Sequence, residues 1–200
     1  MRKAFVAAAL AVAITGLAAP SANAGVLVAS APNCGAQPLS QAFAAFGDAT
    51  NYTPVPGGDF EAGSAAWTTS RASIVSANES YHVRKSGDSR SLAISPSGVA
   101  TSPTVCAGLE HPTMRFFAKS SGLLPVASVS VLTETSLGVV LEVPLGVITP
   151  GSQWHPAPKY LVVANLLPLL PNDYTPIAFR FRAVTGTWSI DDVYLDPRRN

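Results

Sequence analysis

Two adjacent carboxylates, Asp191 and Asp192, lie within the stretch GTWSIDDVYLDP at residues 186–197. The residues around them alternate as in a β-strand with one side facing a core. Strict alternation directs the two side chains to opposite sides of the strand, so we expect one carboxylate among apolar neighbours. A buried carboxylate needs hydrogen-bond donors or a metal ion. The pair therefore predicts either a cation site or a set of backbone N–H partners.

Other residues with catalytic potential form no recognisable catalytic pattern. The three histidines, at positions 82, 111 and 155, fit no zinc motif, and neither a G-x-S-x-G turn nor a glycine-rich phosphate loop is present. Glu134 and Glu142 share one side of a predicted hairpin, offset by ~10 Å along the strands. Glycosidases separate their carboxylates by roughly 5 to 9.5 Å. We therefore expect two solvated charges and no enzyme, and keep a glycosidase using Glu134 and Glu142 as a minor alternative.

The first 24 residues are typical of a signal peptide. Arg2 and Lys3 precede an apolar run, and the small residues at 21–24 predict cleavage after Ala24. We therefore expect a secreted, extracellular protein. Without Arg2 and Lys3 the chain keeps 11 of its 13 basic residues against 12 acidic ones, a net charge of −1.

Neither a basic tract nor a second long apolar segment follows the signal peptide. We therefore expect no nucleic-acid partner and no membrane span. The sequence does not indicate an oligomeric state.

The only two cysteines, Cys34 and Cys106, are both downstream of the predicted cleavage site. In an exported chain they predict one disulfide, here tying an N-terminal arm at residues 25–56 to a domain at residues 57–200. The alternative is two free thiols that bind metal or act in catalysis. No second cysteine or histidine stands at ligand spacing from either, which argues against a metal site.

The composition favours an all-β fold, because charged residues make up only 12% while 15 glycines and 17 prolines punctuate the chain. The SQAFAAFGDA stretch at residues 40–49 predicts one helical turn that ends at Gly47. Short apolar or alternating segments predict strands at 58–62, 71–76, 80–84, 90–95, 99–106, 112–118, 126–134, 138–147, 158–164, 176–184 and 187–195. We expect a two-sheet antiparallel β-sandwich of the jelly-roll type with an irregular N-terminal arm.

Two motifs at opposite ends of this β-rich region carry a family resemblance. GGDFEAGSAAW at residues 57–67 supplies a G-x-F-E…W opening, and the closing strand contains I-D-D-V. Together they resemble the jelly-roll carbohydrate-binding modules with a galactose-binding-domain-like fold, over about residues 55–197. The resemblance implies that the first and last strands are neighbours. It also implies a structural calcium ion bound by Glu61 and Asp191, with Asp192 as second choice. The alternative is that Asp191 accepts backbone N–H bonds or meets an arginine, while Asp192 is exposed.

The resemblance further implies non-catalytic binding of an extracellular polysaccharide. Sugars commonly stack on exposed aromatic rings, and the candidates are Tyr81, Trp154 and Tyr160, with core packing as the alternative. Trp67 and Trp188 are expected in the core. Arg115, Arg180 and Arg182 are candidates for a basic floor that binds an acidic sugar, with ion pairs to Glu142 or Glu134 as the alternative. An extracellular structural or protein-interaction module on the same scaffold is the second functional hypothesis.

Overall fold

The computed structural model describes Leu27 and residues 37–108, 112–162 and 174–197. Within these residues the fold is all-β apart from one short 3₁₀ turn, which confirms the expected fold class. The elements are η1 (Ala44–Phe46), β1 (Thr53–Pro54), β2 (Thr68–Val75), β3 (Ser91–Thr101), β4 (Val105–Ala107), β5 (Thr113–Glu134), β6 (Val140–Ile148), β7 (His155–Pro156), β8 (Tyr160–Leu161) and β9 (Thr175–Asp196).

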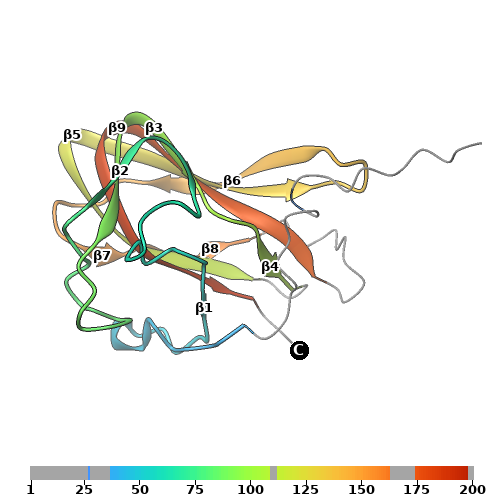
Figure 1. The fold of residues 1–200 in the computed structure, drawn as a ribbon, viewed down its shortest axis with the longest axis horizontal. Helices are drawn as coiled ribbons and strands as arrows, with labels where there is room; N and C mark the ends of the chain where they lie inside the picture. The colour runs from blue at the N-terminus through green and yellow to red at the C-terminus, as the bar shows by residue number, and fades with distance from the viewer. Residues whose placement is uncertain (1–26, 28–36, 109–111, 163–173, 198–200) are drawn as a thin grey trace, which may run out of the picture.

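The strands form one antiparallel sheet in the order β2-β3-β9-β5-β6 (Figure 1). The short strands β1 and β4 pair with β9, whereas β7 and β8 pair with β5. The four segments predicted at 112–118, 126–134, 176–184 and 187–195 are therefore parts of only two strands, β5 and β9. The first and last described strands are neighbours, since Thr53 pairs with Leu195.

Two predicted strands are wrong. Residues 58–62 form tight turns, in which Phe60 N donates to Gly57 O and Gly63 N donates to Phe60 O. Residues 80–84 form a loop, because the backbone N–H groups of Tyr81 and Val83 donate to the Glu79 carboxylate instead of a neighbouring strand. In both places local hydrogen bonds replace the sheet pairing that the apolar pattern favoured.

The long strands bend, and the bends turn the single sheet into two layers. The register shifts between Ser121 and Val126 in β5 and between Ile94 and Val99 in β3. Gly186 in β9 stands at the bend with a φ of 69°, and a Cβ there would lie 2.8 Å from Ser121 O. Only glycine fits both the angle and the close approach. Figure 1 shows β3, β5 and β9 curving over together at one end.

The two layers pack face to face around the main core. Phe116, from the first half of β5, meets Phe181, from the first half of β9, with ring centroids 5.0 Å apart. Trp67 and Trp188 are buried in this core, as predicted. Because the halves of the same two strands face each other across the core, the predicted two-layer sandwich is confirmed.

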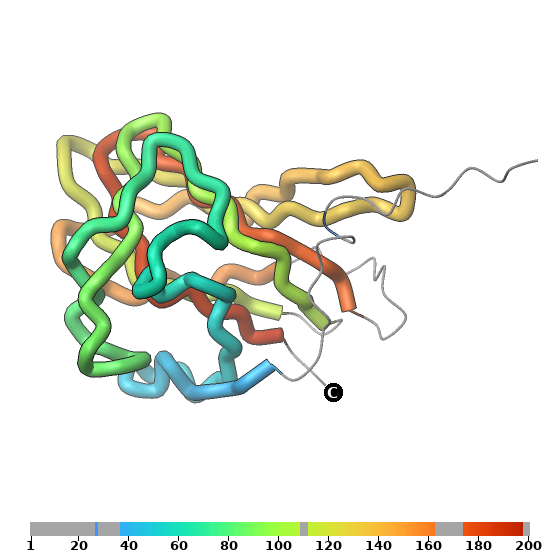
Figure 2. The backbone as a smooth tube through the Cα atoms, in the orientation of Figure 1, coloured from blue at the N-terminus to red at the C-terminus, as the bar shows by residue number. Residues whose placement is uncertain are grey.

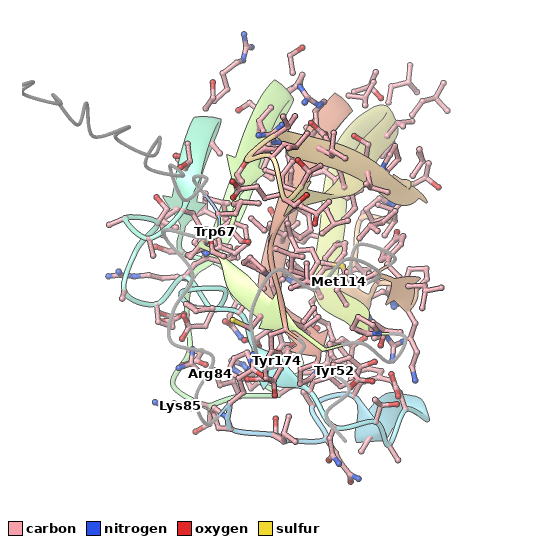
Figure 3. The ribbon with its side chains drawn as sticks, turned by 90° about the vertical axis from the view of Figure 1, so that its right-hand side faces the viewer. Tyr52, Trp67, Arg84, Lys85, Met114 and Tyr174 are labelled. Atoms are coloured by element: carbon pink, nitrogen blue, oxygen red, sulfur yellow. The ribbon has the colours of Figure 1, made fainter. Side chains whose placement is uncertain are left out.

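A second aromatic cluster lies on the outer face of one layer, beneath the N-terminal arm. Phe43 and Tyr52 of the arm pack on Phe117, Trp154 and Tyr194 of the body. The arm runs along one edge of the molecule in Figure 2, and Figure 3 shows Tyr52 below Trp67 and Met114 of the main core. The predicted helical turn is confirmed as η1, which ends at Gly47 with a left-handed φ of 74°.

The predicted signal peptide at residues 1–24 lies outside the described residues, as does Cys34. The Cys34–Cys106 disulfide therefore stays a prediction. Cys106 is buried on β4, and its carbonyl accepts a hydrogen bond from Gln37 Nε2 at 3.1 Å. Gln37 lies three residues after Cys34, so the arm reaches the strand that carries Cys106 close to the predicted disulfide partner. No helix among the described residues is long and apolar enough to cross a membrane.

Candidate functional site

A β-bulge holds the two adjacent carboxylates on β9. Arg115 pairs with Tyr194 but Phe117 pairs with Asp191, so β9 contains one more residue than β5 between these two pairs. Asp192 takes a left-handed φ of 46°, a conformation that aspartate tolerates better than most residues. The expectation of strict alternation across this pair is therefore wrong, because the bulge resets which side each residue faces.

Asp191 is completely buried and fully hydrogen bonded. Its Oδ2 accepts a bond from Glu79 N at 2.8 Å, and its Oδ1 accepts one from Asp192 N at 2.9 Å. The carboxylate therefore fastens β9 to the loop that begins at Glu79. This arrangement matches the alternative in which Asp191 accepts backbone N–H bonds. Burial nevertheless raises the pKa of Asp191 to about 9, since these two bonds offset only part of the lost hydration.

Asp192 is also buried, with 3% of its surface exposed, so the expectation that it faces solvent is wrong. None of the described groups donates a hydrogen bond to its carboxylate. Burial, together with the negative charges of Glu79 and Asp88, raises the pKa of Asp192 to about 7, although the positive charge of Arg84 opposes the rise. Nearby, Asp88 Oδ2 is buried without a hydrogen-bond partner. This corner of the molecule therefore holds more negative charge than its described donors balance.

Glu61, the first predicted calcium ligand, lies close enough to Asp192 to affect its pKa. Its Oε1 accepts backbone hydrogen bonds from Ser89 at 2.8 Å and Arg90 at 2.6 Å. The opening motif also runs beside the closing strand, because Val193 N donates to Gly58 O at 3.1 Å. The motif pair therefore meets in space, as the family resemblance implies.

The chemistry of this cluster suits a hard cation, because all its side-chain donors are oxygens. The oxygens that a cation would satisfy best are the Asp192 carboxylate and Asp88 Oδ2. Among the described residues, however, no three His, Cys, Asp or Glu side chains are grouped to hold one metal ion. Backbone carbonyls and water would have to complete the shell. The calcium site at Glu61, Asp191 and Asp192 stays a prediction.

A second buried carboxylate, Asp48, has the opposite environment. Its Oδ2 accepts hydrogen bonds from Arg115 Nη1 and from the Tyr52 hydroxyl, each at 2.8 Å. Lys159 Nζ lies 2.6 Å from Oδ1. Burial alone would raise the pKa of Asp48, but the hydrogen bonds from Lys159, Thr50 and Tyr52 hold it well below its usual range.

The three arginines predicted as a basic floor do not gather. Arg115 binds Asp48 and the carbonyl of Ala157. Arg180 lies 2.6 Å from Glu142, on the other half of the sandwich, and Arg182 lies 3.9 Å from the same carboxylate. Arg180 and Arg182 therefore form ion pairs with Glu142, which was the alternative to a basic floor.

The aromatic candidates lie mostly in the interior. Trp154 is 6% exposed and Tyr160 8% exposed, so neither ring offers a free face on which a sugar could stack. Tyr81 is 43% exposed, and its hydroxyl donates to Trp154 O at 3.2 Å. Its ring is held edge-on by Phe46, with centroids 4.8 Å apart. Of the three, Tyr81 alone keeps a surface that a ligand could reach.

The two glutamates of the glycosidase alternative lie in different environments. Glu134 is buried, against the expectation of a solvated charge, and its Oε2 accepts a hydrogen bond from Leu27 N at 2.8 Å. Glu142 is exposed and binds Arg180 and Arg182. A buried carboxylate bound to the backbone and an exposed one bound to arginines do not converge on a common cleft.

An open groove of about 660 Å³ lies on the outer face of the layer formed by the first half of β5 and the second half of β9. Its floor and walls come from residues 119–122 and Pro125 of β5, from Thr187 and Ser189 of β9 and from the loop at 150–152. Its polar side chains are Lys119, Ser120, Ser121, Ser152, Thr187 and Ser189, and none of its lining residues is acidic.

Two rungs of the sheet present this polar surface. Lys119 pairs with Ser189, and Ser121 pairs with Thr187. Side chains directly opposite each other lie ~5 Å apart, and successive outward rungs lie ~7 Å apart. The loop wall is fixed, because Ser120 N donates to Gly151 O at 2.9 Å. Sequence reasoning missed these residues, since isolated serines in strands carry no motif.

Comparisons with known proteins address the fold. No protein-family model and no curated protein sequence matches this chain. The enzymatically active domain of tailspike protein 4 from bacteriophage CBA120 matches with a TM-score of 0.50 at 15% identity. The match covers 70% of this chain and 20% of the tailspike chain, so this protein spans only a fifth of that length.

Carbohydrate-binding modules match as well. The C-terminal family 6 module of LamC, a marine laminarinase from Zobellia galactanivorans, has a TM-score of 0.44 at 12% identity, covering 64% of this chain and 90% of the module. A family 16 module has a TM-score of 0.45 at 12% identity, covering 72% of this chain and 99% of the module. The fold resembles the carbohydrate-binding jelly roll. At these identities the similarity concerns the fold alone.

Proposed function

We propose that this protein is a secreted, non-catalytic domain that binds an extracellular glycan in the groove along β5 and β9. The observation that carries the proposal is the concentration of hydroxyl side chains on an open, preformed surface. The hydroxyls of Ser121, Thr187 and Ser189 project from adjacent rungs, and no described group forms a hydrogen bond with them. Sugar hydroxyls are both donors and acceptors, and serine and threonine hydroxyls complement both roles.

The rigidity of the groove supports binding. Ser120 ties the loop at 150–152 to β5 through both its N–H and its hydroxyl. Ordering this loop therefore costs little when a ligand binds, and less of the interaction free energy is lost. Catalysis has weaker support, because the described residues that line the groove include neither a carboxylate nor a histidine that could transfer a proton.

The proposal is tested with the full-length chain on a glycan array and on insoluble polysaccharides. We expect Ser152→Trp, which fills the groove from its exposed loop, to abolish binding. Ser136→Trp is the matched control, since Ser136 is equally exposed in the turn between β5 and β6. Binding of no glycan by the folded protein would refute the proposal, as would equal loss of binding in both variants.

We further propose that one calcium ion stabilises the corner around Asp192 and Asp88. A cation would neutralise the carboxylates that lack described donors, and its role would be structural. Calcium should raise the Tm at about pH 8 and have less effect at about pH 5, where Asp192 is protonated. The measurement is thermal unfolding with calcium, with magnesium and with chelator. The same Tm in all three at about pH 8 would exclude the ion.

The second candidate function is a protein-interaction module, and the hairpin of β5 and β6 favours it. This hairpin extends from the body in Figure 2 and exposes Leu137 at 87%, Val139 at 53% and Val147 at 67%. Exposed apolar residues on an edge strand are a common route to association between chains. Sedimentation velocity over a range of concentrations should then show a dimer that Leu137→Ser removes.

A further inference from the structure

The charge of the groove carries an inference about its ligand. Among the described residues that line the groove, Lys119 alone is charged. Its Nζ lies 4.8 Å from the centroid of the Trp154 ring. Among the described residues, Lys119 forms no ion pair with any carboxylate. Lys119 is thus a partly buried residue whose ammonium group lies over an aromatic ring and pairs with no carboxylate of the described residues.

The contact between Lys119 and Trp154 also explains why an aromatic platform is missing. The cation covers the indole face, so the ring is used to position the lysine rather than to stack a sugar. Recognition in this groove must then come from hydrogen bonds and charge. A neutral sugar would satisfy the hydroxyls of Ser121 and Thr187 but would leave the ammonium without a partner.

We propose that the groove selects an acidic polysaccharide, whose uronate carboxylate pairs with Lys119 while its ring hydroxyls bond to Ser189, Thr187 and Ser121. This inference rests on the proposed glycan-binding function and specifies the class of glycan. The pairing adds a charge-assisted hydrogen bond, which is stronger than a neutral one. The two rungs, ~7 Å apart, give each sugar a separate set of polar contacts.

The test compares one polymer with and without its charge. The probes are sodium polygalacturonate and the same polymer after its carboxylates are reduced to hydroxymethyl groups. Binding of the full-length chain is measured by titration calorimetry in chelator, at low salt and at about 0.15 M salt. We expect up to about fivefold tighter binding of the acidic polymer, with the preference decreasing as salt rises.

Variants at Lys119 locate the effect. Lys119→Gln should remove the preference, so that both polymers bind equally, whereas Lys119→Arg should keep the preference, since it preserves the charge and the ring contact. Lys85→Gln is the control, because Lys85 is exposed on the loop seen at the lower left of Figure 3 and its loss changes the net charge equally. Near-UV circular dichroism confirms that each variant is folded.

The outcomes separate this inference from the proposed function. Equal binding of both polymers, or a preference that survives Lys119→Gln, overturns the acidic ligand and leaves glycan binding in place. Binding to a neutral glycan on the array together with none to polygalacturonate has the same meaning. Binding to no glycan at all overturns both.

Discussion

Two buried carboxylate sites of this protein balance their charge in opposite ways. Asp48 in the arm meets two cations from the body, Arg115 and Lys159. Asp191 and Asp192 in the last strand meet backbone N–H groups and other carboxylates. The pKa of Asp48 is therefore lowered, whereas burial raises the pKa values of Asp191 and Asp192.

The difference shows what each site does for the molecule. The ion pairs of Asp48 attach the arm to β5 and to the segment between β7 and β8, and they are complete without any other component. The site at Asp191 and Asp192 attaches β9 to the loop at Glu79, yet it leaves charge unbalanced. Folding therefore favours a proton or a cation at the second site and neither at the first.

The largest expected effect comes from removing the charge of Asp48. Asp48→Asn leaves Arg115 without its partner, and the Arg115 side chain is only 12% exposed. Breaking a buried ion pair from one side costs about 3–5 kcal/mol. Urea unfolding at neutral pH should show a loss in that range. A loss below about 1 kcal/mol would mean that the hydrogen bond from Tyr52 alone holds the arm.

The second prediction concerns the pH dependence of the intact protein in chelator. A raised pKa means that the folded state holds protons that the unfolded state releases, so stability falls as pH rises above about 4 and through about 7 for Asp192. Asp48 is ionised throughout this window and adds no slope. At about 1.4 kcal/mol per pH unit, Asp192 alone should account for a loss of about 3 kcal/mol between about pH 5 and about pH 8, and Asp191, whose pKa is raised to about 9, adds a loss of the same sign. Stability that rises with pH over this interval would contradict the assignment.

Asp192→Asn should make the second site less sensitive to pH and leave Asp191 as the group there whose pKa is raised. Without the ionisable group the pH dependence above pH 5 becomes shallower, and stability in chelator at about pH 8 should increase by about 1–2 kcal/mol. The variant should also lose any calcium stabilisation of the wild type. Asp88→Asn is the matched comparison, since it removes the same charge at the edge of the cluster. A slope unchanged by Asp192→Asn would assign the pH dependence to another group.

The smallest effect is expected at Lys159. Its side chain is 43% exposed, so solvent screens its contact with Asp48. Lys159→Met should cost no more than about 1 kcal/mol and less at high salt. A loss as large as that of Asp48→Asn would show that Lys159, and not Arg115, is the main partner of Asp48.

Much of the architecture follows from local patterns. The alternation of Phe179 and Phe181 in β9, the turn at Gly47 and the burial of Trp67 and Trp188 are all readable because neighbouring residues alone set the preference. The two motifs at residues 57–67 and 186–197 also led correctly to the jelly-roll resemblance. Side-chain period and turn chemistry act over a few residues, so a sequence displays them directly.

The sites depend on contacts between distant segments. Glu79, whose N–H binds Asp191, lies 112 residues away along the chain, and no local pattern joins the two. The bulge at Asp192 exists only because β5 defines a register against β9. The groove likewise needs three separate segments to meet. The sequence by itself thus determined the all-β fold and its core, whereas the tertiary structure decided which polar groups face each other, because charge balance and cavities depend on three-dimensional proximity.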